Sequence, residues 1–272
     1  MGSADPVLHY DTRGDSSHPP LLFLHGFMGD SADWEDVVSH LSDRYYCVTP
    51  DLPGHGRSLR AEGQGGRGRS YSLTGAAEAV KTVMRDAGLI PATVVGYSMG
   101  GRIALCLATR HPTICSKLVI ESATPGIADP QERQHRLRLD VLRARRLQER
   151  GLPDFLRAWY RQPIFETIAE SPTRLESIIR RRSDNDPSAI GAVLIGMSVG
   201  GQESLWDELS HLNMPVLLIA GERDGKYVDV VQAMAAGLPM ASVKIMPQCG
   251  HTVHLEDPSG FARRLERFLQ QA

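Results

Sequence analysis

Long apolar runs, an excess of one charge and any metal-ligand spacing are all missing from this 272-residue sequence. No apolar run approaches the roughly 20 residues that a membrane-spanning helix needs. The first residues lack the basic and apolar regions of a secretory signal. A formal net charge of −2 gives no global electrostatic support for binding nucleic acid or a membrane surface. We therefore expect a cytoplasmic protein that binds neither, and the composition sets no oligomeric state.

Cysteine and lysine are scarce. The four cysteines have no C-x-x-C spacing, which indicates buried free thiols; they are Cys47, Cys106, Cys115 and Cys249. Because metal-ligand spacing and a dinucleotide fingerprint are both missing, we predict no metal and no cofactor. Only 4 of the 30 basic residues are lysines, and the 13 arginines between residues 125 and 205 are accompanied by none. Most of these arginines are expected on solvated helix faces, and a few are expected to face a ligand.

Short apolar runs alternate with helix-like stretches along most of the chain. Runs typical of buried strands cover residues 21–24, 46–49, 93–95, 118–120, 216–219 and 243–246. Helix-like stretches cover residues 31–41, 72–87, 101–110, 228–236 and 259–270. This alternation predicts an α/β fold with a mostly parallel sheet flanked by helices.

The pentapeptide Gly96-Tyr97-Ser98-Met99-Gly100 stands between a predicted strand and a predicted helix. In that context G-x-S-x-G forms a nucleophile elbow, whose strained turn leaves no room for a Cβ at the two glycines. A plain Gly/Ser-rich turn is the alternative, but the flanking elements favour catalysis by Ser98.

A reactive serine needs a base, and the base needs an acid that orients it. In this fold the acid follows the serine in the sequence, and the histidine base follows the acid. Asp224 lies just after the predicted strand at 216–219, and His251 lies just after the one at 243–246. Carboxyl ends of parallel strands meet where such sheets gather their active sites. We therefore predict a Ser98–His251–Asp224 triad.

Other acids and histidines compete for these roles. Glu222 lies two positions before the predicted acid, and Glu121 ends another predicted strand, so either is an alternative acid. His254 is a candidate capping or substrate-binding group. We expect His25 to shape a loop and His55 to lie in a tight surface turn.

Negative charge that develops on a substrate oxygen needs preorganised donors. The residue after an elbow serine donates one backbone N–H, here that of Met99. We predict that the second donor is the backbone N–H of Phe27, in the loop after the first core strand.

The middle of the chain has no convincing strand. Between residues 125 and 205 only helix-like segments occur, such as 132–150 and 175–182. We predict a helical cap at 125–205, inserted over the end of the sheet into a core made of residues 1–124 and 206–272. Residues 62–70, rich in glycine and arginine, lack Walker spacing and are expected to form a flexible surface loop.

Further motifs narrow the choice of protein family. They are Arg102 after the elbow, E-S-A-T-P-G at 121–126, W-Y-R-Q-P-I-F at 159–165, R-S at 182–183, G-E-R-D-G-K at 221–226 and G-H at 250–251. The whole set resembles the α/β-hydrolase superfamily, which implies little about substrate. More narrowly, it resembles the 2-succinyl-6-hydroxy-2,4-cyclohexadiene-1-carboxylate (SHCHC) synthases, the MenH family, and the segment at 159–165 is the most discriminating piece.

This resemblance implies a carbon–oxygen lyase of menaquinone biosynthesis. Such enzymes eliminate pyruvate from 2-succinyl-5-enolpyruvyl-6-hydroxy-3-cyclohexene-1-carboxylate to give SHCHC. Ser98 would act as a base activated by His251, with Asp224 fixing the imidazole tautomer. The N–H groups of Phe27 and Met99 would hold an enolate-like oxygen.

A small-molecule substrate with three carboxylates should meet planar guanidinium groups. Arg102 lies one helical turn beyond the elbow serine, so it can reach the same pocket; a surface ion pair is its alternative role. The resemblance adds Arg136 and Arg182 from the cap, with Tyr97 and Trp159 lining the site. Trp159 could equally be a core aromatic of the cap.

Two other functions remain open on these residues. A serine hydrolase, either an esterase or a C–C bond hydrolase acting on an acidic substrate, would use the same triad through covalent or hydrated intermediates. A non-catalytic ligand receptor on a hydrolase fold would not need all three triad members in order, and this chain has them.

Overall fold

Within residues 8–60 and 71–271, which the computed structural model describes, seven strands form one sheet in the order β1-β3-β2-β4-β5-β6-β7. The strands are β1 (Tyr10–Arg13), β2 (Pro20–Leu24), β3 (Tyr46–Pro50), β4 (Ala92–Tyr97), β5 (Cys115–Glu121), β6 (Val216–Gly221) and β7 (Ala241–Met246). β1 pairs antiparallel with β3, and the other pairings are parallel. The predicted α/β fold with a mostly parallel sheet is confirmed; the loop predicted at 62–70 lies outside the described residues.

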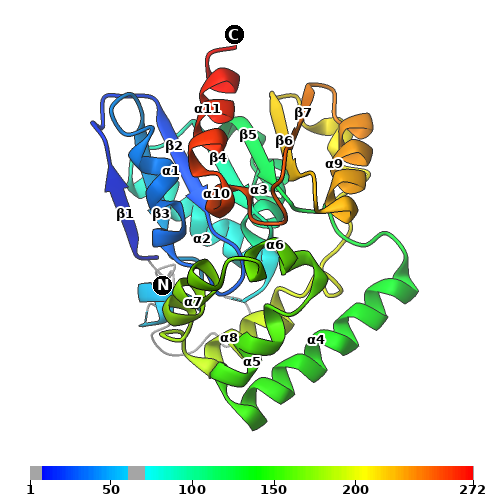
Figure 1. Cartoon of the computed structure of the whole chain (residues 1–272). Helices are drawn as coiled ribbons and strands as arrows, with labels where there is room; N and C mark the ends of the chain where they lie inside the picture. Colours follow the sequence, from blue (N-terminus) through cyan, green and yellow to red (C-terminus); the bar gives the residue numbers. More distant parts are fainter. Residues whose placement is uncertain (1–7, 61–70, 272) are drawn as a thin grey trace, which may run out of the picture.

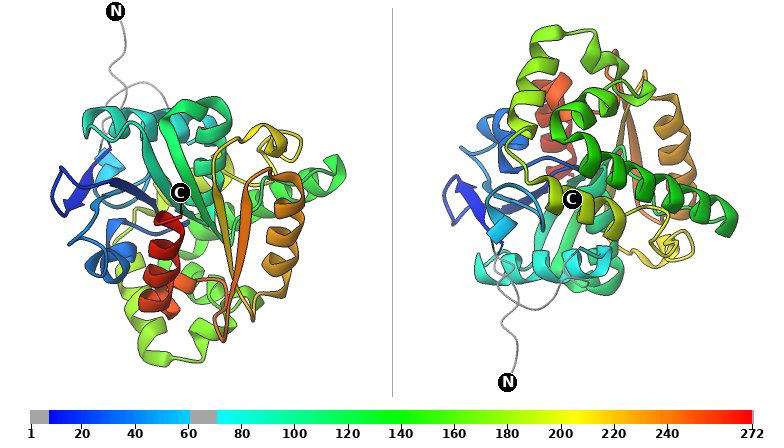
Figure 2. Two further views of the ribbon diagram at one scale, coloured as in Figure 1. Left: turned by 90° about the horizontal axis from the view of Figure 1, so that it is seen from above. Right: turned by 90° about the horizontal axis from the view of Figure 1, so that it is seen from below.

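Helices cover both faces of this sheet (Figure 2). One face carries α2 (Leu73–Asp86), α3 (Met99–Arg110) and α9 (Gly225–Gly237), and the other carries α1 (Glu35–Ser39) and α11 (Pro258–Leu269). Because side chains alternate along a strand, Leu22 and Leu24 of β2 enter the first core, whereas Leu21 and Phe23 enter the second. Burial on both faces explains why the strands read as continuous apolar runs.

Acidic residues followed by proline start two of the longer helices. Asp129 accepts a hydrogen bond from the N–H of Glu132, and Asp257 accepts one from the N–H of Gly260. The prolines that follow them need no hydrogen-bond partner at the first helical position. These caps begin α4 and α11 within two residues of the predicted starts.

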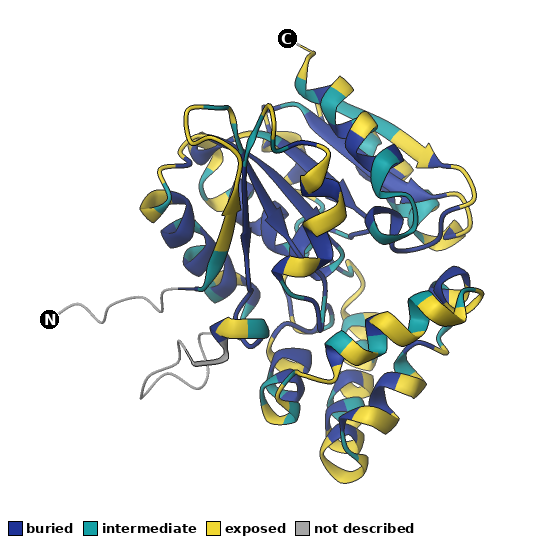
Figure 3. Ribbon diagram, turned by 60° about the vertical axis from the view of Figure 1, so that its left-hand side comes forward, coloured by how far each residue is buried: buried dark blue, intermediate teal, exposed yellow. Residues whose placement is uncertain are grey.

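A helical segment, residues 130–196, connects β5 to β6. It contains α4 (Pro130–Arg150), α5 (Leu152–Trp159), α6 (Glu166–Ala169), α7 (Pro172–Arg182) and α8 (Pro187–Gly196). This α4–α8 segment lies over one end of the sheet, with exposed outer faces (Figures 1 and 3). It has its own apolar cluster, which includes Leu147, Leu156, Ile168 and Ile190. Although α4 has 21 residues, neither it nor another helix in the described ranges has the apolar length to cross a membrane.

The turn from β4 to α3, at the carboxyl end of the sheet, has a strained backbone. Ser98 has φ +49° and ψ −107°, outside the regions that L-residues normally populate. A Cβ on Gly96 would lie 2.5 Å from the carbonyl oxygen of Gly100. A Cβ on Gly100 would press into the carbonyl oxygens of Leu24 and His25. The two glycines of the motif therefore allow three backbone segments to meet at Ser98.

Replacing Gly100 with alanine should destabilise the protein by at least about 2 kcal/mol, because rigid backbone atoms would have to move. Thermal or urea unfolding measures this change. Gly237→Ala is a matched control, since a Cβ there meets Leu209 at an ordinary 3.6 Å. Equal stability of the two variants would contradict the close backbone approach.

Candidate active site

Three predicted residues meet at the end of the sheet that the α4–α8 segment covers. Ser98 Oγ lies 3.4 Å from His251 Nε2, and His251 Nδ1 lies 2.6 Å from Asp224 Oδ2. Asp224 follows β6 and His251 follows β7, so the strand ends bring together groups that are 153 residues apart in sequence. His251 and Asp224 are both buried. The arrangement can pass a proton from Ser98 to an imidazole held by a carboxylate.

The competing acids lie elsewhere. Glu121 Oε1 accepts hydrogen bonds from the backbone N–H of His254, at 3.1 Å, and from His254 Nδ1, at 2.9 Å, so these two candidates pair with each other. Glu222 is exposed and accepts from the N–H of Gln248. Neither glutamate contacts His251.

The loop after β2 faces Ser98 and is fixed by a histidine. Phe27 and Met99 both line the cavity beside the serine. Met99 is the first residue of α3, where a helix leaves backbone N–H groups without intrahelical acceptors. The next residue of the loop, Met28, has φ +63° and donates its N–H to His55 Nε2 at 3.0 Å. The geometry is compatible with the two predicted oxyanion donors.

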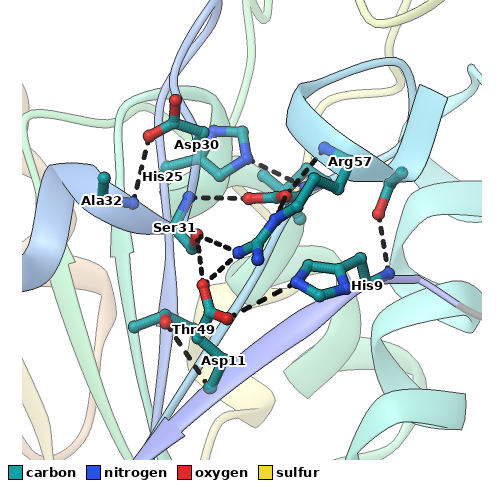
Figure 4. Close-up of polar contacts among 11 residues, drawn as sticks. His9, Asp11, His25, Asp30, Ser31, Ala32, Thr49 and Arg57 are labelled. Carbon is teal, nitrogen blue, oxygen red and sulfur yellow. Dashed lines mark hydrogen bonds and ion pairs between the residues drawn. The ribbon is translucent and has the colours of Figure 1, made fainter.

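His55 corrects the sequence prediction, because it is fully buried and not part of a surface turn. Its neighbour His25 accepts the Leu52 N–H at Nε2, 2.9 Å away, and shapes the loop as expected. Asp51 binds the N–H groups of Ser31 and Arg57, both at 2.8 Å, in the cluster shown in Figure 4. These buried contacts tie the loops after β2 and β3 together, which the local turn chemistry of the sequence does not reveal.

A cavity of about 400 Å³ lies between the triad and the α4–α8 segment. Nine of the ten predicted site residues line it: Phe27, Tyr97, Ser98, Met99, Arg102, Arg136, Trp159, Arg182 and His251. The tenth, Asp224, lies behind His251. Trp159 also packs on Phe27 and Phe155, with ring centroids 5.0 and 5.6 Å apart, so it is both a lining residue and a core aromatic.

Arg102 is a half-buried cation without a carboxylate partner among the described residues. Its Nη1 donates to Gln202 Oε1 at 2.7 Å, and its Nη2 donates to the carbonyl of Met197 at 2.8 Å. Burial, followed by the nearby charge of Arg136, lowers the pKa of Arg102 to about 10. The surface ion pair considered as an alternative is therefore not formed, and the cavity holds an uncompensated positive charge.

Each of the two predicted cap arginines forms an ion pair with an aspartate. Arg136 Nε donates to Asp140 Oδ2 at 2.9 Å, and Arg182 Nη2 donates to Asp33 Oδ2 at 2.6 Å. Burial tends to raise the pKa of Asp33, but the charge and hydrogen bond of Arg182, together with the charges of His254 and Arg181, lower it overall. Arg182 Nε and Nη1 are buried without a partner in the described structure, so this guanidinium keeps free donors at the cavity wall.

A family model described as the alpha/beta hydrolase fold matches residues 19–258. The chain belongs to the α/β-hydrolase family. Among its relatives, the SHCHC synthase of Serratia proteamaculans is 32% identical over 94% of this chain and 95% of its own length. Protein PHYLLO of Arabidopsis thaliana is 31% identical over 96% of this chain, which spans 16% of that protein.

Solved structures of α/β hydrolases also resemble this chain. MenH from S. aureus has a TM-score of 0.90 and 30% identity, and the match covers 97% of this chain and 98% of that one. A thermophilic esterase from Thermogutta terrifontis has a TM-score of 0.83 at 22% identity, over 97% and 93% of the two chains, and shows the fold alone. The similarity to SHCHC synthases that the motifs predicted is confirmed.

Sequence reasoning missed two cations that line the same cavity of this α/β hydrolase, Arg143 and Lys226. Arg143 binds Asp140 Oδ1 at 2.9 Å and Gln162 Oε1 at 3.1 Å, and its guanidinium lies 5.7 Å from the ring centroid of Trp159. Its spacing of three residues from Asp140 on one helix was the available signal. Lys226 ends the G-E-R-D-G-K motif, which by itself does not indicate a role for this lysine. Among the described residues, no group of three or more His, Cys, Asp or Glu side chains is placed to hold a metal ion.

Acid should loosen the loop that faces Ser98. His25 and His55 accept hydrogen bonds at Nε2 only when neutral, and burial lowers the pKa of both below 6.5. As pH falls below about 6.5 the unfolded chain binds protons that the native protein excludes, so stability present above this pH is lost. We expect the unfolding free energy to fall by up to about 1.4 kcal/mol per pH unit for each histidine.

Urea unfolding between about pH 7.5 and about pH 5 measures this slope. In His55→Gln the amide oxygen can still accept the Met28 N–H but does not titrate, so the slope should lose one histidine's share. A slope unchanged in this variant would count against the role of His55.

Proposed function

We propose that this enzyme is a menaquinone-pathway lyase that eliminates pyruvate from 2-succinyl-5-enolpyruvyl-6-hydroxy-3-cyclohexene-1-carboxylate to give SHCHC. The observation that carries the proposal is the half-buried Arg102, which lines the same cavity as Ser98 and His251 and has no carboxylate partner among the described residues. Burying an unpaired charge is unfavourable unless a ligand supplies the counter-charge. The similarity to SHCHC synthases, named for a carboxylate product, supports the same conclusion.

The proposed reaction is a base-catalysed elimination. Ser98 Oγ removes the ring proton beside the succinyl carbonyl as its own proton passes to His251 Nε2, and the imidazolium is stabilised by Asp224. The electrons form an enolate-like oxygen held by the N–H groups of Phe27 and Met99. When the enolate collapses, a double bond forms at ring carbons 2 and 3, the 3,4 double bond moves to carbons 4 and 5, and the C5–O bond breaks. The departing enolpyruvate then takes up a proton and becomes pyruvate.

The substrate's three carboxylates require cations on more than one wall. In this proposal the core contributes Arg102, while the cap at residues 125–205 contributes Arg136 and Arg182, which line the cavity from α4 and α7. Tyr97 lines the wall between them and packs its ring on His251 at 5.5 Å. Burial raises the pKa of Tyr97 well above 10, so its phenol stays a neutral hydrogen-bond donor.

Pyruvate release tests the proposal directly. The enzyme should release one pyruvate for each freshly prepared enolpyruvyl substrate molecule, followed by a coupled assay, and Ser98→Ala should lose at least about 10³-fold in rate because the base is gone. Failure to release pyruvate, from protein that still hydrolyses a nitrophenyl ester, would instead assign a serine hydrolase. Failure of both activities, together with no labelling of Ser98 by a serine reagent, would favour a receptor.

Replacing Arg102 with alanine should lower kcat/KM for the enolpyruvyl substrate by about 30-fold or more, equivalent to roughly 2–5 kcal/mol of lost carboxylate binding. Turnover of a small neutral ester, where measurable, should barely change. Equal losses on the two substrates would show that Arg102 supports the fold through Gln202 and Met197 rather than binding a carboxylate.

A further inference from the structure

Lys226 is a cavity-lining cation for which the part of the chain that the structure describes supplies no hydrogen-bond acceptor. It is exposed and lines the cavity, so it lies at the mouth. Among the described residues no acidic side chain lies within ion-pair distance of its Nζ, which sits 5.5 Å from the ring centroid of Tyr227. By contrast Lys81 binds Glu78 at 2.6 Å, and Lys117 binds the carbonyls of Phe268 and Leu269.

The position of Lys226 is electrostatically unfavourable for a cation. It is the second residue of α9, a 13-residue helix whose start carries the positive end of the helix dipole. The helix's N-cap carboxylate, Asp224, is held by His251 and makes no capping bond. Arg136 of α4 lines the same cavity as a second cation. Partial desolvation by the surrounding protein, followed by the charge of Arg136, lowers the pKa of Lys226, although Asp224 opposes this shift.

We propose that Lys226 binds a carboxylate of the substrate at the mouth of the cavity that Arg136 also lines. An anion there would relieve the repulsion between the two cations and the unfavourable helix position at once. The compact ammonium suits a solvated entrance, where it attracts the ligand and then makes one contact, whereas the planar arginines grip carboxylates deeper in the cavity. This inference rests on the proposed function and adds a binding residue to it.

Steady-state pyruvate release with three variants tests the inference. Lys226→Gln should raise KM about tenfold or more, with kcat within about threefold of wild type, because a charge-assisted contact is lost but the triad is intact. Lys226→Arg keeps the charge and should restore most of the affinity. Lys244→Gln removes an exposed lysine on β7, outside the cavity, and should leave KM unchanged. A wild-type KM in Lys226→Gln, or a fall in kcat alone, would overturn the proposal.

The pH dependence of KM gives a second readout. Binding needs the charged ammonium, so the wild-type KM should rise as pH increases through the lowered pKa of Lys226. Arg136, Asp224 and Tyr227 are the charged or titratable groups beside it, and only Lys226 changes in Lys226→Arg. The alkaline rise in KM should move to higher pH or disappear in that variant; an unchanged rise would contradict the assignment.

Labelling separates this inference from the proposed reaction. Acetic anhydride followed by mass spectrometry can report each of the four lysines, because the chain has so few. In Ser98→Ala, which should hold unreacted substrate, the enolpyruvyl compound should protect Lys226 and leave Lys244 reactive. If wild-type protein releases no pyruvate, the proposed function fails, and protection of Lys226 by citrate would still support an anion site. Absence of protection by both compounds would overturn it.

Discussion

The contact on which the site depends is the backbone approach of α3 to the end of β2. Gly100 lets the first turn of α3 lie against the carbonyl groups of Leu24 and His25, and Gly96 lets β4 turn back beneath the same helix. This packing fixes Ser98 in its strained conformation. It also sets the start of α3 beside the loop of Phe27, so a backbone N–H from each segment can face one substrate oxygen. One steric constraint therefore positions the proposed base and both proposed donors.

The second constraint is electrostatic. Five cations line the cavity, and Asp140 and Asp33 are their only acidic partners among the described residues. Both aspartates are buried and orient guanidinium groups without cancelling the whole charge. Partial pairing of this kind preorganises cations and keeps donors available, as the unpartnered Nε and Nη1 of Arg182 illustrate.

Local and topological signals in the sequence predicted the core of the fold and the meeting of Ser98, His251 and Asp224. The strand–turn–helix context and the strand-end rule need no knowledge of side-chain packing. β1 escaped prediction because its four residues are largely exposed and carry no apolar run. The sequence also did not predict the burial of His55 or the Arg182–Asp33 ion pair. They depend on segments 27 and 149 residues apart in sequence, whose contact no local pattern reports.

The Thermogutta terrifontis esterase shares this fold at 22% identity, and a shared fold does not by itself set what a protein acts on. The chemistry must then be set by what surrounds the serine. Here the cavity wall contains cations from the elbow helix, the α4–α8 segment and the start of α9. A neutral ester has no charge with which to satisfy them, whereas a polycarboxylate can satisfy several at once. Such a ligand would compensate the charge of the half-buried Arg102, and this would link the unfavourable placement of charge in the cavity to selectivity for a polycarboxylate.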